Sequence, residues 1–348
     1  MFGSYFEQQR ISFEARLFKM NIITIAKKAG TSKSTVSRVI NGSGPVKEAT
    51  RKKVLETMEA LGYRPNIFAQ GMKTNQSRTI AVLIPEYTNP FFPALLAAIE
   101  RVLRPQDYVT MVCSGGTDEH SELASIRFAL SRRVDGIIFH SYDRHVKTVK
   151  LLLETNRQIP VVLMDPMMNN PKISSVFVDG FKGTVEAVNH LVRVGRRRIA
   201  YIKGTHDVVS DRFQGYLQAL DNAGLKMPET YVYAGDFTIE SGEKAAQYFL
   251  GLDQFPDAIV SGTDNMAFGV INGLLKAGIR IPEQVCVVGF DNLEMSSIFV
   301  PSLSSIAVPI SEIGQKAAQI LLHQIVHPDT KPSHVVLDCE LILRDSAP

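Results

Sequence analysis

The sequence is poor in cysteine and has no segment typical of a signal peptide or a membrane span. Of its 348 residues three are cysteine, Cys113, Cys286 and Cys339, which lie far apart and form no CxxC pair. We therefore expect free thiols rather than disulfides or a zinc site. No apolar run approaches the roughly 18 residues that a spanning helix requires, and charged residues interrupt the start of the chain. These absences predict a soluble, cytoplasmic, globular protein.

Motifs of common enzyme classes are also missing. The chain has no GxxxxGK[ST] or GxGxxG loop at a strand-to-helix turn and no HExxH, and its one Gly-Gly pair, Gly115 and Gly116, is isolated. We therefore expect neither an enzyme nor a cofactor.

Positive charge is concentrated near one end of the chain. Between Met20 and Arg78, 11 Lys and Arg stand against three acidic residues, a net charge of +8, whereas the whole chain carries +3. A basic segment on a mildly acidic body is typical of nucleic-acid binding by the segment. The length favours two or more domains, and 45% hydrophobic residues can form a large core.

Three helical patterns occupy the basic segment. Apolar residues recur at helical spacing over residues 22–29, and Gly30 can take the left-handed conformation that ends a helix. Ser32 is suited to cap a second helix over residues 33–40, and a third is expected over residues 47–61. A helix, a glycine turn, a second helix and a supporting helix form the helix-turn-helix arrangement, in which the second helix reads DNA.

The second of these helices carries a polar stripe opposite its apolar face. Short hydroxyls and long cationic donors, as in this stripe, suit the base edges and phosphates of a major groove. The stripe consists of Lys33, Ser34, Ser37 and Arg38.

The segments "IAKKAGTSKSTVSRVING" and "VKEATRKKVLETMEALGYRPN" resemble the N-terminal signature of the lactose-repressor (LacI/GalR) family of bacterial transcription regulators. The resemblance implies that Lys33, Ser34 and Arg38 read bases. It departs at Ile23 and Thr24, where Lys or Tyr and then Asp are usual, so the first helix is expected to contact the DNA backbone differently. Nearer the phosphates the resemblance places Asn21, Ser32, Thr35, Ser37 and Asn41.

The resemblance also divides the chain. Met20 lies where family members begin, so residues 1–19 are expected to be an upstream extension. Residues 20–65 form the expected helix-turn-helix domain, residues 66–78 a hinge helix and linker, and residues 79–348 an effector-binding and dimerisation domain.

The predicted hinge helix is short. It starts after Pro65 and contains Gly71, so in isolation it should be marginal in water. The resemblance implies that it pairs with the hinge helix of a second subunit in the minor groove, where Asn66, Ala69 and Met72 contact DNA and Met72 replaces the leucine that kinks it. A plain linker is the alternative.

The body of the chain alternates apolar runs with amphipathic helical patterns. Nine strand patterns, from "TIAVLIP" to "VCVVGFD", are continuous in apolar residues, which is typical of parallel sheets covered on both faces. Nine strands exceed one comfortable doubly wound sheet, so we expect two halves divided near residues 176–179. The predicted fold is an all-α helix-turn-helix domain followed by an α/β, periplasmic-binding-protein-like domain with two doubly wound parallel-sheet subdomains.

A ligand of this body is expected beyond the carboxyl ends of its strands. Aromatic, acidic, amide and arginine residues follow the predicted strands, which suits a neutral, hydroxyl-rich ligand such as a sugar. The resemblance implies that Arg212 in "SDRFQGY" and Asp264 in "GTDNMAFG" anchor the effector. It also implies that the site is lined by Phe91, Phe92, Asp179 and Phe237.

Several of these residues have a structural alternative. Asp264 and Asp291 each precede a helical pattern and could serve as N-caps. Arg212 could form a surface ion pair, both phenylalanines could be core residues, and a histidine such as His140 is more often structural.

The sequence thus predicts a transcription regulator, a repressor of carbohydrate-utilisation genes that is controlled by a sugar-like effector. No heptad repeat, of the kind that forms the tetramerising tail of some family members, follows "ELILRDSAP". We therefore expect a homodimer on a pseudo-palindromic operator. The alternative is a carbon-catabolite regulator whose co-effector is a phosphorylated carrier protein, although we expect such a regulator to lose Arg212. The usual "GHRxI" element has Arg196 in place of its histidine.

Overall fold

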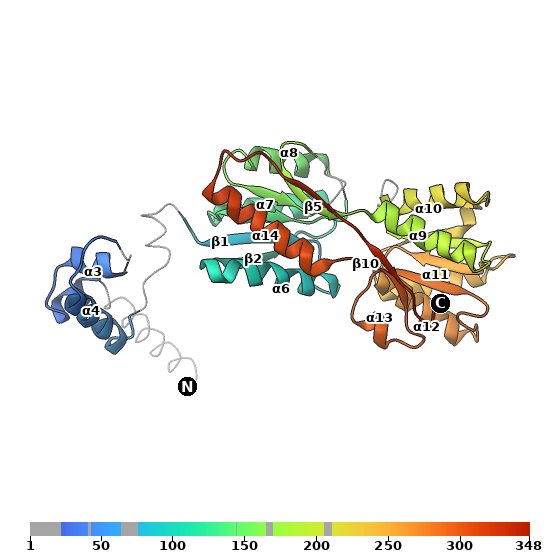
Figure 1. Cartoon of the computed structure of the whole chain (residues 1–348), viewed down its shortest axis with the longest axis horizontal. Helices are drawn as coiled ribbons and strands as arrows, with labels where there is room; N and C mark the ends of the chain where they lie inside the picture. Colours follow the sequence, from blue (N-terminus) through green and yellow to red (C-terminus); the bar gives the residue numbers. More distant parts are fainter. Residues whose placement is uncertain (1–21, 41–42, 64–75, 144, 165–169, 205–210) are drawn as a thin grey trace, which may run out of the picture. The chain divides into compact units, whose positions relative to one another are not determined.

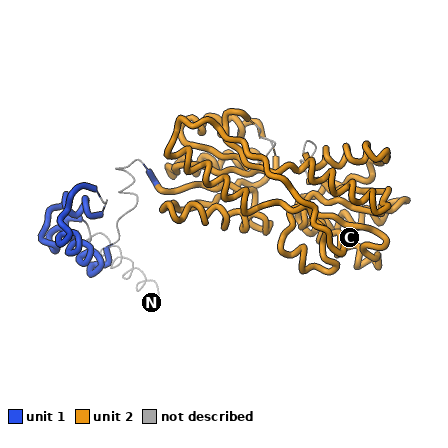
Figure 2. The backbone as a smooth tube through the Cα atoms, viewed as in Figure 1, with its two compact units in different colours: residues 1–77 blue, residues 78–348 orange. Residues whose placement is uncertain are grey.

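The computed structural model of the chain describes residues 22–40, 43–63, 76–143, 145–164, 170–204 and 211–348. The chain separates into two compact units, residues 1–77 and 78–348, which Figure 2 colours differently. The expected N-terminal extension and most of the predicted hinge lie outside the described residues. So do five of the predicted DNA-binding residues: Asn21, Asn41, Asn66, Ala69 and Met72.

The first unit contains the three predicted helices, α2 (Ile22–Lys28), α3 (Lys33–Ile40) and α4 (Glu48–Ala60) (Figure 1). The turn between α2 and α3 is left-handed as expected, with φ of +62° at Gly30. The helices pack around a small apolar core that includes Ile25, Val36, Val54 and Met58. The helix-turn-helix prediction is confirmed.

The second unit holds two six-stranded sheets. The first has the order β11, β5, β4, β3, β1, β2, and all its neighbouring strands are parallel. In chain order these strands are β1 (Thr79–Ile84), β2 (Val109–Ser114), β3 (Gly136–Phe139), β4 (Val161–Leu163), β5 (Ser174–Val178) and β11 (His334–Leu337).

Helices cover both faces of this sheet. Alternate residues of β1 enter different cores, because Ile80 and Val82 belong to one buried cluster and Ala81 and Leu83 to another. This explains why the strand is apolar throughout. Two packed pairs of helices cover the sheet, α6 (Phe91–Leu103) with α14 (Ile310–Val326) and α7 (Glu119–Ser131) with α8 (Val146–Thr155), and a short 3₁₀ turn, η1 (Arg104–Gln106), follows α6.

The second sheet has the order β12, β10, β9, β8, β6, β7, and only β12 runs antiparallel to its neighbour. Its strands are β6 (Ile199–Gly204), β7 (Val232–Gly235), β8 (Ala258–Ser261), β9 (Cys286–Asp291), β10 (Ser304–Ala307) and β12 (Glu340–Ile342). Its helical elements are α9 (Gly180–Arg193), α10 (Asp211–Asn222), η4 (Glu229–Tyr231), α11 (Ile239–Leu250), α12 (Asp264–Lys276) and the short α13 (Met295–Ile298). Here α9 packs with α10, and α11 with α12.

The chain crosses between the two sheets three times: after β5, before α14, and between β11 and β12 (Figure 1). The first crossing follows Val178, within the predicted division. Three strands, β10, β11 and β12, were not predicted. The prediction of a helical N-terminal domain, followed in the sequence by two parallel-sheet subdomains, is confirmed. None of the helices in the described part of the chain has the length and apolar composition needed to cross a membrane.

Candidate functional site

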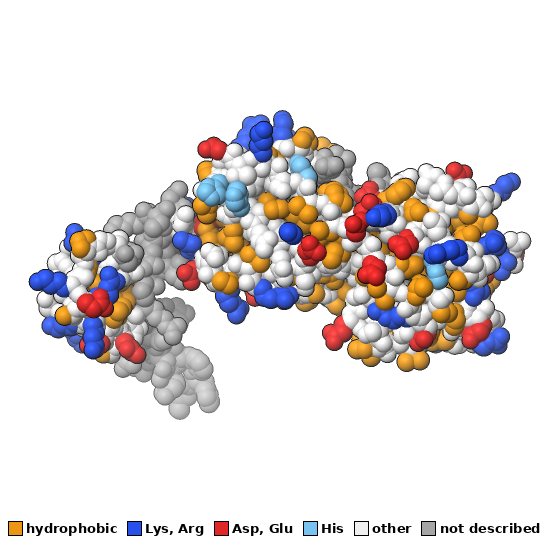
Figure 3. Space-filling view, viewed as in Figure 1, with side chains coloured by type: hydrophobic (Ala, Val, Ile, Leu, Met, Phe, Trp, Pro, Cys, Tyr) orange, Lys and Arg blue, Asp and Glu red, His pale blue; other side chains and the backbone are white. Residues whose placement is uncertain are grey.

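The predicted recognition helix α3 presents the expected stripe. Val36 and Val39 are buried, whereas Lys33, Ser34 and Arg38 are exposed. Figure 3 shows Lys and Arg side chains over the visible face of this unit. The exposed donors are therefore available to a partner on one face of the helix.

Ser32 caps this helix, as the sequence suggested. Its Oγ accepts a hydrogen bond from the backbone N–H of Thr35 at 3.1 Å and lies 2.8 Å from the hydroxyls of both Ser34 and Thr35. The cap fixes the first turn of α3, which carries the predicted base-reading residues Lys33 and Ser34.

The second unit contains a cavity of about 130 Å³, with walls from both subdomains. The first subdomain contributes mainly rings, and the second adds charged and hydroxyl groups. The residues that line it include Asn89, Phe91, Phe92, His140 and Tyr142 from the first subdomain and Arg212, Phe237, Thr263 and Asp291 from the second.

Four of the six predicted effector residues, Phe91, Phe92, Arg212 and Phe237, lie together on the cavity wall. Asp179 is not among the lining residues. Its Oδ1 accepts a hydrogen bond from the backbone N–H of Lys182 at 2.9 Å and so caps α9, whose first residue, Gly180, does line the cavity. Asp179 thus shapes the beginning of a helix beside the cavity.

The structure does not bring Asp264 to the cavity, which differs from the prediction. Its carboxylate is fully buried and accepts hydrogen bonds from the Leu293 N–H at 2.8 Å, from Ser296 Oγ at 2.5 Å and from Ser305 Oγ at 2.6 Å. The physical reason is that Thr263 is the N-cap of α12, so Asp264 is the first helical residue and turns into the protein. These three bonds connect α12 to α13 and to the chain on either side of α13.

Asp291, at the end of β9, is one of two acidic residues on the cavity wall, the other being Asp211 at the start of α10. Burial raises the pKa of its carboxyl group, an effect that the positive charge of Arg212 opposes and the nearby Asp264 carboxylate reinforces. Sequence reasoning left Asp291 as a possible N-cap. Its position after a strand pattern, in "GFDN", had also placed it among the residues considered for the ligand site.

Arg212 is held at the cavity by contacts with the protein. Its guanidinium carbon lies 3.7 Å from the centroid of the Phe290 ring, and its Nη1 donates to the Gly262 carbonyl at 2.6 Å. A Cβ at Gly180 would come within 2.9 Å of the Arg212 side chain, so the absence of a side chain there makes room for the arginine.

Burial, with a smaller contribution from Arg212, lowers the pKa of His140 to about 4, so this ring is neutral near pH 7.

Sequence reasoning missed Tyr142, which follows β3 at the cavity edge of the first sheet. Its ring stacks on Phe237 with a centroid distance of 4.2 Å and an interplanar angle of 23°. Phe237 has φ of +69°, a conformation that few residues other than glycine adopt. Tyr142 and Phe237 therefore join the two subdomains beside the cavity.

Replacing Asp291 with asparagine is expected to stabilise the protein increasingly as the pH rises. The folded-state pKa of Asp291 lies above its unfolded value, so the stability that the neutral carboxyl group contributes at low pH is lost from about pH 4 upward through the raised folded pKa. Asparagine tolerates the positive φ of this position and cannot ionise. The free energy of unfolding of the variant, relative to that of wild type, should therefore be at least about 1 kcal/mol higher at pH 8 than at pH 4.

Urea unfolding of wild type and Asp291→Asn between pH 4 and pH 8 measures this difference. The exposed Asp221, replaced in the same way, is the control and should leave the pH profile unchanged. A difference between Asp291→Asn and wild type that is constant with pH would contradict the burial argument.

Comparisons with known proteins agree with this architecture. Residues 21–66 match the profile "Bacterial regulatory proteins, lacI family", and residues 77–345 match "Periplasmic binding proteins and sugar binding domain of LacI family". The chain is 36% identical over 323 residues to catabolite control protein A of Priestia megaterium, which covers 91% of this chain and 96% of that protein.

Two solved structures are similar over nearly the whole chain. A lac repressor dimer bound to operator and the anti-inducer ONPF has a TM-score of 0.86 at 26% identity, covering 94% of this chain and 99% of that one. A complex of the transcriptional regulator CelR with cellobiose has a TM-score of 0.71 at 30% identity, covering 94% and 100%. The chain therefore belongs to the lacI family of bacterial regulatory proteins, DNA-binding transcription regulators that carry a periplasmic-binding-protein-like sugar-binding domain.

Proposed function

We propose that this protein represses carbohydrate-utilisation genes, and that a small sugar or sugar derivative bound in the cavity controls it. The lining of the cavity supports this proposal, because it combines the rings of Phe91 and Phe237 with the guanidinium of Arg212 and the carboxyl group of Asp291. Aromatic rings pack against the apolar faces of a sugar, while a guanidinium donates hydrogen bonds to its hydroxyls and a carboxylate accepts them. We propose no reaction and no cofactor for this protein, and we expect it to act in the cytoplasm as a DNA-binding regulator.

Known relatives support a DNA-bound, ligand-controlled regulator. The solved relatives include a repressor dimer on its operator and a regulator holding a disaccharide. By analogy, we propose that two copies of this chain bind a pseudo-palindromic operator, with α3 in the major groove and the segment 66–78 in the minor groove.

Control would follow from closure of the two subdomains around the effector. Closure would change how the paired N-terminal units are held, and with it the order of the hinge segments on DNA. A coupling of about 1–3 kcal/mol would change operator affinity about 5- to 150-fold.

Two measurements test the proposal in sequence. Selection of binding sites from a randomised duplex library, at roughly physiological salt because phosphate contacts dominate at lower salt, should yield a pseudo-palindrome. Calorimetry of the full chain against a panel of monosaccharides, disaccharides and sugar phosphates should then identify a ligand that changes binding to that site. A selected site that responds to no sugar in the panel would contradict sugar control but not DNA reading.

A second candidate function is carbon-catabolite regulation with a phosphorylated carrier protein as co-effector. The similarity to a catabolite control protein favours it. Titration of the protein with such a carrier, phosphorylated and unphosphorylated, separates the two functions. Binding of only the phosphorylated carrier, with increased operator affinity, would favour this candidate over the sugar-controlled repressor.

An aspartate at Ile298 is expected to disrupt the proposed dimer. Large apolar side chains gather in and after α13, where Met295 is 51%, Ile298 64% and Val300 81% exposed. Such a surface suits the centre of an interface, where a hot-spot residue contributes about 2 kcal/mol or more. Ile298→Asp should therefore raise the dimer dissociation constant at least about 30-fold, as measured by analytical ultracentrifugation.

The matched control is Val146→Asp. Val146 begins α8 in the other subdomain and is 80% exposed, more than Ile298, so this substitution adds the same charge at another open apolar position. The control should remain dimeric. If both substitutions raised the dimer dissociation constant equally, or if neither raised it, the assignment of this surface would be contradicted.

A further inference from the structure

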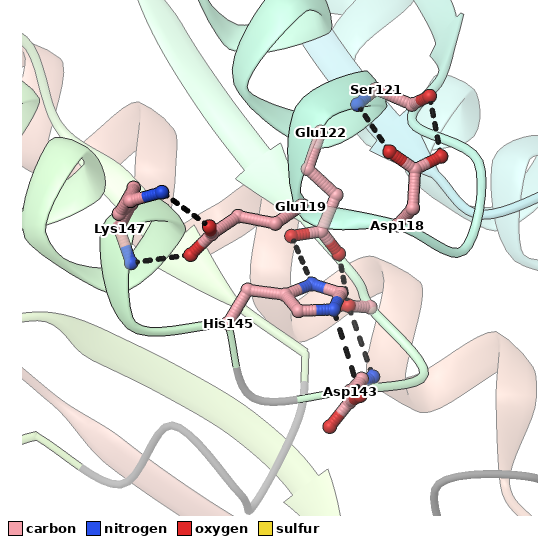
Figure 4. Close-up of polar contacts among 8 residues, drawn as sticks. Asp118, Glu119, Ser121, Glu122, Asp143, His145 and Lys147 are labelled. Carbon is pink, nitrogen blue, oxygen red and sulfur yellow. Dashed lines mark hydrogen bonds and ion pairs between the residues drawn. The ribbon is translucent and has the colours of Figure 1, made fainter.

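A buried carboxylate lies beside the cavity without lining it. Glu122, on α7, is only 1% exposed, although glutamate is rarely buried without partners. It faces the segment that follows β3, which contains Ser141, Tyr142 and Asp143. Figure 4 shows the carboxylate of Glu122 pointing toward His145. A side chain of this kind requires hydrogen bonds, because an unpaired buried charge is costly.

The Glu122 carboxylate finds its partners on both sides of Tyr142. One oxygen accepts a hydrogen bond from the hydroxyl of Ser141, and the other lies 2.9 Å from Nδ1 of His145 (Figure 4). The Asp143 backbone N–H donates to Ser141 Oγ at 3.1 Å, and Asp143 Oδ2 lies 3.5 Å from His145 Nε2. The backbone on either side of Tyr142 is thus connected to one anchor on α7.

The far end of Tyr142 is also fixed. Its hydroxyl donates to Glu86 at 2.8 Å and accepts from the Asn89 side-chain amide at 3.3 Å. Burial, reinforced by the negative charge of Glu86, raises the pKa of Tyr142, so the hydroxyl stays protonated and can donate. With both ends held, the ring has one orientation, flat against Phe237 of the other subdomain.

We infer that Glu122 is a positioning residue, which acts through Ser141 and His145 to hold Tyr142 against Phe237 and thereby shapes the cavity where the subdomains meet. The inference deepens the proposed effector site and rests on it. Loss of the anchor should leave the fold in place but release the ring at position 142 from its partner.

A tryptophan reporter tests this role directly, because the chain has no tryptophan. The full chain with Tyr142→Trp is examined alone, with Glu122→Leu and with Phe237→Leu. Leucine fills the buried space of Glu122 without accepting a hydrogen bond. Both added substitutions should shift the emission to longer wavelength and raise the acrylamide quenching constant at least about twofold, because a ring released from a stacked, buried contact meets solvent.

Two further variants separate positioning from general destabilisation. Ser141→Ala combined with His145→Leu removes the same two hydrogen bonds from the other side and should reproduce the shift. Glu122→Gln keeps an acceptor for Ser141, so the emission wavelength and the quenching constant of this variant should stay close to those of the Tyr142→Trp protein.

The matched control is Glu119→Leu. Glu119 lies on the same helix but contacts Lys147, whose backbone N is 2.8 Å and whose Nζ is 3.2 Å from the Glu119 carboxylate (Figure 4). Its replacement should leave the emission unchanged. Unchanged emission with Glu122→Leu, or an equal shift with Glu119→Leu, would overturn the inference. No effector is used, so a negative result would leave sugar binding to be judged by its own titration.

Discussion

Replacement of Arg38 with alanine is expected to weaken operator binding at least about 30-fold. A side chain that reads a base edge contributes about 1–3 kcal/mol of discrimination, and a dimer on a pseudo-palindrome would lose two such contacts. Arg38 is exposed on α3, and its aliphatic stem is close to Gly44, where an added Cβ would lie 3.6 Å from Arg38 Cδ. The substitution therefore removes a surface donor and leaves the small core of Ile25, Val36 and Val54 intact.

Fluorescence anisotropy with the selected site and with an unrelated duplex measures this effect. Lys52→Ala on α4 is the control, because Lys52 is exposed and lies outside the predicted reading stripe. Its Nζ is 4.0 Å from Oε1 of Glu56. This substitution should change affinity for both duplexes alike, whereas Arg38→Ala should mainly reduce the preference for the selected site. An equal loss on both duplexes with Arg38→Ala would assign this side chain to the phosphates.

Replacement of Arg212 with methionine is expected to lower effector affinity about 100-fold and to remove the effect of the ligand on operator binding. Hydrogen bonds to a charged group contribute about 1.5–3 kcal/mol each, and methionine keeps much of the aliphatic bulk. The substitution also removes the positive charge that opposes the raised pKa of Asp291. That carboxyl group should then hold its proton to still higher pH and accept hydroxyl bonds less well.

Calorimetry with the sugar found in the panel measures the loss. Arg193→Met is the control, because Arg193 is exposed in the last turn of α9 and is not among the cavity residues. It should bind the sugar as wild type does. Unchanged affinity and unchanged operator response with Arg212→Met would show that the effector binds elsewhere.

Most of the fold could be predicted because its central strands are buried on both faces. The strand β1 is apolar at nearly every position, and this signal separates a parallel sheet from an alternating one. The three strands that were not predicted are short and mixed in polarity, such as Ser304–Ala307 and Glu340–Ile342. Their strand conformation comes from pairing with neighbours, which is information that no local pattern carries.

The site was less predictable, because an aspartate after a strand can either cap a helix or line a cavity. Asp264 and Asp291 occupy similar local sequences, but Asp264 follows the cap at Thr263 and is buried as a hydrogen-bond acceptor, whereas Asp291 lines the cavity. Arg196 is a further case. It replaces the usual histidine, and its long side chain donates to the carbonyls of Pro282 at 2.5 Å and Glu283 at 3.3 Å. Such contacts depend on partners more than 80 positions away.

The three crossings of the chain between the sheets have a genetic consequence. Strands of the first sheet come from residues 79–178 and again from residues 334–337, and strands of the second from residues 199–307 and again from residues 340–342. Neither subdomain is encoded by one continuous stretch of gene. A single recombination event with a relative would therefore join mismatched halves of at least one sheet, so new effector preferences in this architecture are expected to arise by point substitution of cavity residues rather than by exchange of a whole subdomain.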